Sequence, residues 1–138
     1  MGDYHLIDHT ADFGLHVKGA DPADLFITAG LAMFEVLTDV SRLKGCNTQT
    51  VRIDGEGWPD LMVNWLRELL YLWSGEEKLV CRIEIESLSE TSLAAVVTYD
   101  DFRSDHHQIE NEIKAVTYHQ IQVSPVGDGW EARIIFDV

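Results

Sequence analysis

Basic residues are scarce in this sequence. It holds ten Lys and Arg against 24 Asp and Glu in 138 residues, which gives a formal net charge of −14 at pH 7. A phosphate backbone repels such a chain, so strong, sequence-independent binding to nucleic acid is excluded as its main activity. No stretch reaches the roughly 18 apolar residues of a membrane-spanning helix, and no basic segment precedes an apolar core near the first residue. We therefore expect a cytoplasmic protein that does not bind membranes.

Cysteine and proline are rare as well. The two cysteines, Cys46 and Cys81, lack the spacing of a CxxC motif, and two thiols do not make the disulfide framework of a small secreted domain. We expect both to be reduced and to serve the structure. The three prolines stand beside expected element boundaries, and no repeat or linker interrupts the chain. With 46% hydrophobic residues, residues 1–138 are expected to fold as one domain.

Two segments carry the pattern of amphipathic helices. The first follows Asp21-Pro22, a capping acid and a proline at the first helical position, and should end near Thr38-Asp39. The second begins at Trp58-Pro59-Asp60 and ends at Gly75, where a glycine is typical of a helix C-terminus. Its wide apolar face predicts the most buried element of the fold. The residues of that face are Leu61, Met62, Trp65, Leu66, Leu69, Leu70, Leu72 and Trp73.

Alternation of apolar and polar residues predicts strands in much of the remaining chain. The alternating or strand-like segments are 13–18, 51–53, 81–86, 93–99, 113–123 and 130–138. Residues 87–91 and 124–129 are expected hairpin turns, and residues 101–112 an expected polar connection. The predicted fold class is α+β: a single domain with two helices packed on a mostly antiparallel sheet of about six to eight strands.

The motifs of several enzyme classes are missing. The sequence has no GxSxG nucleophile elbow, no Walker loop and no HExxH zinc motif, and Gly55-x-Gly57 lacks the rest of a dinucleotide-binding fingerprint. No catalytic residue is predicted. Five histidines that could act as bases or ligands lack metal-binding spacing, so ordinary surface or capping roles are expected for them. They are His9, His16, His106, His107 and His119.

Two acidic positions are candidates for a metal site. Asp137 and the carboxylate of Val138 place two anionic groups on adjacent residues at the end of an expected strand, and Ca²⁺ and Mg²⁺ prefer oxygen ligands. An ordinary solvated strand end explains the same residues. Asp12 lies on the polar face of the first expected strand, where it fits either a turn or a ligand. The residue types alone leave both readings open.

Lys114 lies in an otherwise acidic stretch of the chain. On a regular strand it would share a face with Val116 and Tyr118, whereas His119 would lie on the opposite face. These side chains could then not all act at one point. A lysine among acids is commonly a solvated counter-charge, so the residue types alone give Lys114 no specific role.

Five segments, taken in order, resemble the archease family and span nearly the whole chain. They are His9-Thr10-Ala11-Asp12, the helix from Leu25-Phe26 to Met33-Phe34, Asn64-Trp65-Leu66-Arg67-Glu68-Leu69-Leu70-Tyr71, Ile113-Lys114-Ala115-Val116-Thr117-Tyr118-His119, and Ile135-Phe136-Asp137-Val138. Phe13 stands at a place that is more often aliphatic in the family, a departure that concerns packing.

The resemblance implies an accessory protein, not a stand-alone enzyme. Archeases assist the RtcB-type RNA ligase of tRNA splicing or RNA repair by promoting its guanylylation and multiple turnover. The family's metal site carries over onto the side chains of Asp12 and Asp137 and a backbone oxygen of Val138, which would hold a divalent cation, expected to be calcium. Lys114 and His119 are candidates for contact with the ligase. The acidic surface would suit a basic partner.

The sequence is also compatible with two other functions. The same carboxylates could activate water in a stand-alone metal-dependent hydrolase. The chain could also be a general chaperone or modulator of nucleic-acid-processing proteins. Phosphatase and phosphodiesterase assays without any ligase would separate the first from an accessory role, and the number of partners captured from a lysate would separate the second.

Overall fold

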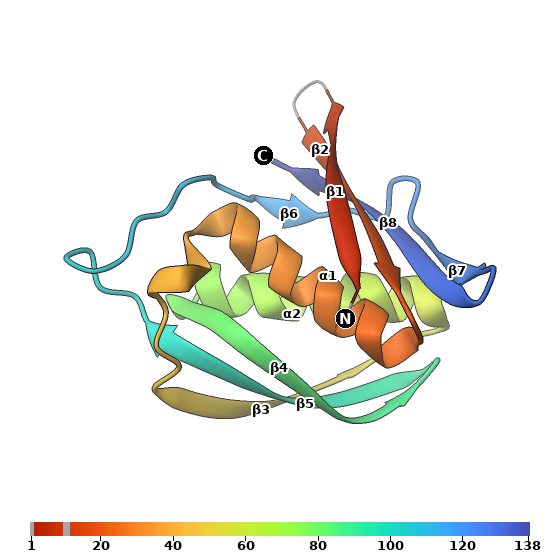
Figure 1. Ribbon diagram of the computed structural model, residues 1–138, viewed down its shortest axis with the longest axis horizontal. Helices are drawn as coiled ribbons and strands as arrows, with labels where there is room; N and C mark the ends of the chain where they lie inside the picture. The colour runs from red at the N-terminus through yellow and green to blue at the C-terminus, as the bar shows by residue number, and fades with distance from the viewer. Residues whose placement is uncertain (1, 10–11) are drawn as a thin grey trace.

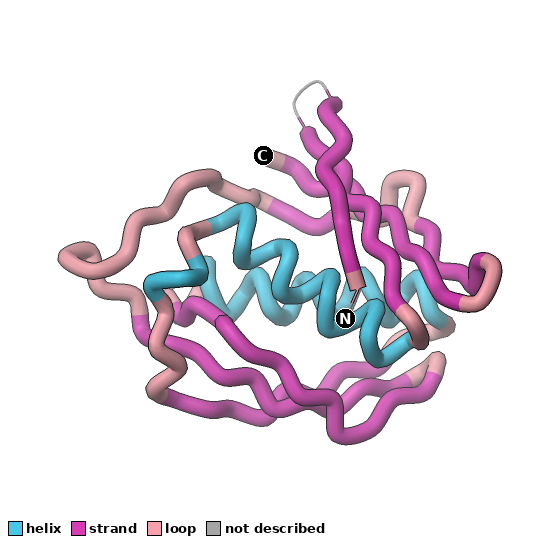
Figure 2. The backbone as a smooth tube through the Cα atoms, in the orientation of Figure 1, coloured by secondary structure: helices cyan, strands magenta, loops and turns pink. Residues whose placement is uncertain are grey.

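Two α-helices lie between two antiparallel sheets, and both helices contact strands of each sheet (Figure 1). The computed structural model of the chain describes residues 2–9 and 12–138. One sheet has five strands, in the order β1-β2-β8-β6, with β7 also paired to β8; the other has three, in the order β3-β5-β4. The expected α+β class is confirmed, and the division of the strands into two sheets is a feature that the sequence pattern did not reveal. Figure 2 shows the two sheets, in magenta, with the layer of helices, in cyan, between them.

The five-stranded sheet joins the beginning and the end of the described chain. Its strands are β1 (Asp3–His9), β2 (Asp12–Gly19), β6 (Ala115–Val116), β7 (Gln122–Val126) and β8 (Gly129–Asp137). The three-stranded sheet consists of β3 (Asn47–Asp54), β4 (Lys78–Ser89) and β5 (Ser92–Asp101). The polar connection expected at 101–112 is confirmed as the segment that leads from β5 to the five-stranded sheet.

Both predicted helices are present at the expected positions. In α1 (Pro22–Leu37), the carboxylate of Asp21 caps the helix by accepting the Asp24 N–H at 2.8 Å. A short 3-10 helix, η1 (Val40–Arg42), follows. In α2 (Trp58–Ser74), Gly75 is the C-cap as expected, but its backbone stays in the right-handed helical region, with φ at −99°. The local signals of capping residues thus placed both helices correctly.

The glycines of Gly55-x-Gly57 shape the connection from β3 to α2. A Cβ on Gly55 would lie 2.7 Å from the backbone of Leu61, so a side chain there would force the strand end and the helix apart. Gly57 is the N-cap of α2 and has φ at +117°, a conformation that favours glycine. The two glycines therefore have a role in the conformation of the backbone. Such a role needs no dinucleotide-binding fingerprint, which the sequence lacks.

The packed core fills the space between the helices and both sheets. Trp65 of α2 is fully buried, and its indole N–H donates to the carbonyl of Phe26 in α1 at 2.9 Å. This bond satisfies the only polar atom of a large buried side chain and fixes the two helices against each other. No helix in the described part of the chain is both long and apolar enough to cross a membrane.

The prediction of one continuous strand over residues 113–123 is wrong. The structure has two strands there, β6 and β7, both paired with β8 and separated by a turn in which Gln120 takes a positive φ of 53°. The predicted loop at 124–129 shrinks to a tight turn, because β7 runs to Val126 and β8 begins at Gly129. The expected face-sharing of Lys114 and Val116 also fails: Lys114 is exposed and Val116 is buried, since β6 is only two residues long.

Candidate functional site

Asp12 and Asp137 lie directly opposite each other in the five-stranded sheet. Asp12 begins β2, Asp137 ends β8, and the antiparallel register of the two strands makes them Cα partners. The Asp12 side chain is half-buried and that of Asp137 is exposed. The structure therefore brings together two carboxylates that are separated by nearly the whole chain.

The backbone hydrogen bonds at this end of the sheet draw the two acidic side chains closer. The Asp137 carbonyl oxygen accepts the Lys114 N–H at 2.8 Å, so the peptide groups of Asp137 face β6 and point away from β2. Asp12 and Asp137 are thus a non-hydrogen-bonded pair, the type in which opposing side chains approach most closely. Like charges directly opposite each other destabilise a sheet, so a cation between them would be stabilising.

The donor atoms at this position fit a hard divalent cation. Asp12 and Asp137 offer carboxylate oxygens, and the adjacent Val138, whose side chain is 42% exposed, offers a backbone oxygen. Within residues 2–9 and 12–138, no group of three His, Cys, Asp or Glu side chains is arranged to hold a metal. Because Ca²⁺ takes about six to eight oxygens, water or a partner protein would have to supply further ligands. Thr10 and Ala11 of the first family segment, and the side chain of His9, lie outside what the structure describes.

Lys114 belongs to this site and His119 lies on a neighbouring turn. Lys114 precedes β6, next to the residue that is opposite Asp137, and its exposed side chain starts from the backbone that bonds to Asp137. His119 is exposed in the turn between β6 and β7, where its N–H donates to the Thr117 hydroxyl at 3.2 Å. The structure thus places one partner-contact candidate beside the acidic pair and the other further along the same edge.

An open groove of about 470 Å³ adjoins the acidic pair and was not found from the sequence. We call it the hairpin groove, and its lining residues are Leu6, Phe13, Val36, Glu110, Asn111, Glu112 and Val138. Leu6 is 52% exposed and adds apolar area to the groove. The only feature of the sequence that could have indicated this groove was Leu6, an apolar residue on the outer face of β1, and β1 itself was not predicted. The groove combines an apolar floor with two glutamates, a composition suited to an apolar and basic partner surface.

One wall of the hairpin groove is fastened to the end of α1. The side-chain amide of Asn111 donates to the Val36 carbonyl at 2.8 Å, and the Glu110 N–H donates to the Leu37 carbonyl at 2.8 Å. The Thr38 hydroxyl also donates to the carbonyl of Gln108 at 2.7 Å. These bonds hold part of the long connection in a fixed position beside the groove.

The histidines whose side chains the structure describes are scattered and do not gather at the acidic pair, while the backbone of His9 lies opposite Asp12 in the β1–β2 pair. His16 is nearly buried in β2, where its Nε2 lies 3.0 Å from a carboxylate oxygen of Glu131 on β8. His106 and His107 follow β5 at the other sheet. Both cysteines are free thiols, Cys46 exposed and Cys81 half-buried. Structural or surface roles therefore account for the histidines that the structure describes near β2 and β8.

The fold and this site define a small α+β domain that presents paired carboxylates and an apolar groove at one end of a sheet. The model of the archease protein family (MTH1598/TM1083) matches residues 4–138. The protein archease of Methanosarcina acetivorans is 33% identical over 139 residues, covering 98% of this chain and 95% of that protein. The protein archease of Methanothermobacter thermautotrophicus is 30% identical over 141 residues, covering 100% of both.

Solved structures agree with the sequence comparisons. The solution structure of Methanobacterium thermoautotrophicum protein 1598 matches with a TM-score of 0.81 and 28% identity, over 98% of each chain. The crystal structure of an archease, possible chaperone, from Thermotoga maritima matches in fold with a TM-score of 0.66 and 21% identity, over 96% of this chain and 94% of that one. The chain belongs to the archease family.

Proposed function

We propose that this chain is an accessory factor that activates an RtcB-type RNA ligase, by promoting its guanylylation and multiple turnover in tRNA splicing or RNA repair. The observation that carries the proposal is the direct pairing of Asp12 with Asp137 at the end of the five-stranded sheet, with Lys114 beside them. Membership of the archease family over residues 4–138 supports it. In this role the chain is a protein cofactor and contributes no catalytic residue of its own.

A divalent cation, calcium, completes the site in this proposal. Asp12, Asp137 and a backbone oxygen of Val138 hold it, and their oxygen chemistry is what supports the assignment. When bound, such a cation offsets carboxylate charge and offers positive charge to phosphate oxygens of a partner's site. The protein's own contribution is to keep the two carboxylates at a fixed separation on paired strands.

The surface around the acidic pair recognises the ligase. Glu110 and Glu112 add negative charge at the hairpin groove, while Leu6 and Val138 add exposed apolar area. A partner with a basic and apolar surface meets both features, and charge complementarity speeds its encounter with a domain of net charge −14. Lys114 would then pair with an acidic or phosphate group of the partner at the edge of the contact.

Ligase activity over many turnovers, measured with and without this protein, tests the proposal. The wild type should raise the number of RNA joints per ligase, and Asp12→Asn and Asp137→Asn should each reduce this stimulation at least tenfold. Asp128→Asn is the matched control, because Asp128 is exposed in the turn between β7 and β8, away from the site. Circular dichroism of each variant confirms folding. Equal stimulation by folded wild type and both site variants would refute the metal-site role, and no stimulation by the wild type would refute the activation.

A general chaperone is the second candidate, favoured by the exposed apolar lining of the hairpin groove. Immobilised wild type and a Leu6→Glu variant should be compared in capture from a lysate. One dominant ligase that is lost in the variant supports the accessory role, whereas many clients support the chaperone. Phosphodiester hydrolysis by the protein with Ca²⁺, Mg²⁺ or Mn²⁺ and no ligase would instead support a metal-dependent hydrolase.

A further inference from the structure

A second pocket, of about 540 Å³, lies at the end of the three-stranded sheet and includes no residue of the five-stranded one. We call it the basic pocket. Its walls come from the loop between η1 and β3, from the end of β5 and from the segment that follows β5. The residues that give it its character are Arg42, Lys44, Cys46, Arg103, His106 and His107. Its volume falls within the range of about 300–1,000 Å³ that small-molecule sites occupy.

Positive charge is concentrated in this pocket although the protein is strongly acidic. Arg42, Lys44 and Arg103 are three of only ten basic residues in the chain, and all three line it. Within the part of the chain that the structure describes, the side chains of Arg42 and Lys44 make no hydrogen bond or ion pair. The N–H groups of these two side chains are therefore available to a ligand in the pocket, although the charge of Arg42 also acts on Asp39.

The two acids of the pocket are already engaged by the protein itself. The buried carboxylate of Asp100 accepts the successive backbone N–H groups of Lys44, Gly45 and Cys46, at 2.7, 2.9 and 2.9 Å. Three successive amides around one carboxylate form an anion-binding nest, which Asp100 fills. Asp101 lies opposite Lys78 in the sheet, and its charge acts on that lysine. Both acids keep their negative charges, so the lining of the pocket carries three positive and two negative charges, a net charge of +1 with the histidines neutral.

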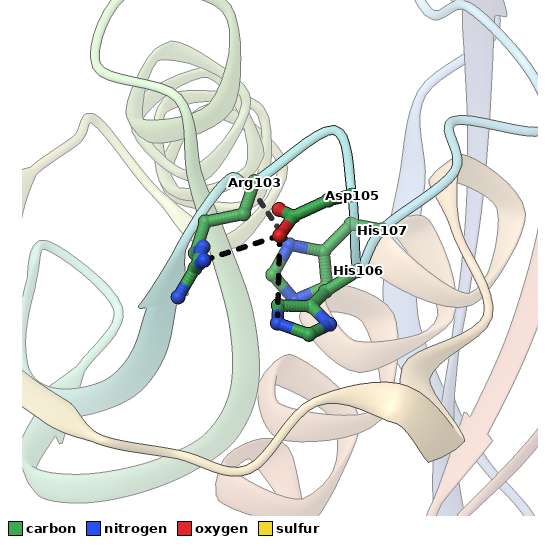
Figure 3. A network of polar contacts seen from close by, with 4 residues as sticks. All are labelled: Arg103, Asp105, His106 and His107. Carbon is green, nitrogen blue, oxygen red and sulfur yellow. Dashed lines mark hydrogen bonds and ion pairs between the residues drawn. The ribbon is translucent and has the colours of Figure 1, made fainter.

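Hydrogen bonds also orient the side chains of Arg103 and His107, which line the pocket (Figure 3). The backbone N–H of Arg103 donates to Nδ1 of His107 at 2.9 Å, so the neutral ring carries its hydrogen on Nε2, which is left as a donor. The Arg103 guanidinium uses Nη2 to bind a carboxylate oxygen of Asp105 at 3.1 Å, and this bond restrains its position. Its other N–H groups stay available as donors.

We propose that the basic pocket binds a small molecule through a phosphate group. Arg42, Lys44 and Arg103 supply charge and N–H donors for phosphate oxygens, and Nε2 of His107 supplies one more donor. The remaining volume and the polar side chain of Asn47 accommodate an uncharged portion of the ligand. This site is separate from the carboxylate pair and does not depend on the proposed metal or ligase.

Titration of ¹⁵N-labelled protein, followed by amide chemical shifts, tests the proposal. The probes are inorganic phosphate, ribose 5-phosphate and adenosine 5′-monophosphate, each at about 0.1 M ionic strength to screen the net negative charge. The expected result is saturable shifts at the amides of Lys44, Gly45, Arg103 and His107, with the acidic pair unmoved. The double variant Arg42→Gln/Lys44→Gln should weaken binding at least tenfold. The matched control is Arg52→Gln, which removes an exposed charge on β3 outside the pocket.

The three probes distinguish the source of the phosphate. Equal affinity for all three supports a site for phosphate itself, and tighter binding of one organic phosphate supports a sugar-phosphate or nucleotide site. Shifts that chloride reproduces at equal concentration, or that the double variant leaves unchanged, would overturn the proposal. So would saturable binding of a 5′-phosphorylated oligonucleotide with no binding of the small probes, because that result would assign the pocket to a nucleic-acid end.

Discussion

The hydroxyl of Tyr118 donates a 2.5 Å hydrogen bond to Oδ1 of Asp60, which ties the turn after β6 to the first turn of α2. Arg67, also in α2, lies with its guanidinium carbon 4.7 Å from the centre of the Tyr118 ring and donates from Nε to the Val116 carbonyl at 3.0 Å. The short strand β6 is thus held by α2 on one side and by β8 on the other. This support positions Lys114 beside the acidic pair.

Replacing Tyr118 should destabilise the turn after β6, and the size of this destabilisation should depend on pH. The hydrogen bond from Tyr118 lowers the pKa of the Asp60 carboxyl, and the same bond raises the pKa of the Tyr118 hydroxyl. The stabilisation is therefore present above the ordinary pKa of an aspartate and is lost as the pH falls through the lowered pKa of Asp60. It is also lost as the pH rises through the raised pKa of Tyr118.

We expect Tyr118→Phe to lower the Tm by at most a few degrees at pH 7 and by less at pH 3, which lies below the ordinary pKa of an aspartate of about 3.9. Thermal unfolding followed by circular dichroism measures the difference. Tyr71→Phe is the matched control, since Tyr71 is a 54%-exposed tyrosine in α2, the helix that contains Asp60. A drop of equal size at both pH values would contradict the role of ionised Asp60.

Asp137→Asn should make the protein more stable when no divalent cation is present. The change removes one of two like charges that face each other across β2 and β8, a term of about 0.2–1 kcal/mol for a cross-strand pair. The wild type should gain stability on addition of millimolar Ca²⁺, and the variant should gain less. Urea unfolding in EDTA and in Ca²⁺ gives both free energies. A variant less stable than the wild type in EDTA would refute the repulsion.

Asp100→Asn should destabilise the loop between η1 and β3 and the whole domain by about 1–3 kcal/mol, because a buried acceptor of three N–H groups loses its charge. Burial opposes ionisation of Asp100, but the hydrogen bonds from the backbone of Lys44, Cys46 and Gly45 outweigh it and lower the pKa. The wild type should therefore lose its advantage as the pH falls below about 4 and through that lowered pKa.

Urea unfolding between pH 3 and pH 7 measures this loss. Asp101→Asn, at the exposed neighbouring position, should change stability far less. A free-energy difference between wild type and Asp100→Asn that stays constant over the pH range would show that the charge of Asp100 is not what holds the loop.

Cys46 should react slowly with alkylating reagents although it is exposed. Its hydrogen bond to Asp100 and the negative charge of that residue raise the pKa of the thiol, so little thiolate forms at neutral pH. In a Cys81→Ser background, the rate of reaction with iodoacetamide should rise with pH to a midpoint above about 8.5, the ordinary cysteine value. Asp100→Asn in the same background should lower the midpoint, and a wild-type midpoint at or below the ordinary value would contradict the assignment.

The sequence-based predictions were most accurate for elements whose bounds depend on residues close together in the chain. The helix ends depend on capping residues a few positions apart, such as Asp21 with Asp24, and both helices were placed within about a residue of their bounds. Strand β1 pairs only with β2, the next strand in the chain, and it was not predicted because the adjacent apolar residues Leu6 and Ile7 interrupt its alternation. The break between β6 and β7 depends on how each pairs with β8, and it was not predicted either. Alternation of residue types identifies a strand but not its neighbours, so it could not separate the two sheets.

The candidate site shows the same limit. The spacing of Asp137 and Val138 suggested oxygen donors, but nothing in the local sequence placed Asp12 opposite Asp137; only the family resemblance joined them. The β2–β8 register supplies that relation physically, and the metal and ligase roles stay predictions. The hairpin groove and the basic pocket arise from loops folded against helix and strand ends, which no periodic pattern describes.

The position of β8 also bears on when the protein can fold during its synthesis. This strand alone pairs with β2, β6 and β7 among the described strands, and it is the last of them in the chain. Until the ribosome has released residues 129–137, strands β2, β6 and β7 have no common partner, and closing the loop between β2 and β8 costs chain entropy. The three-stranded sheet can form earlier, whereas the carboxylate pair assembles only after residues 129–137 have been synthesised.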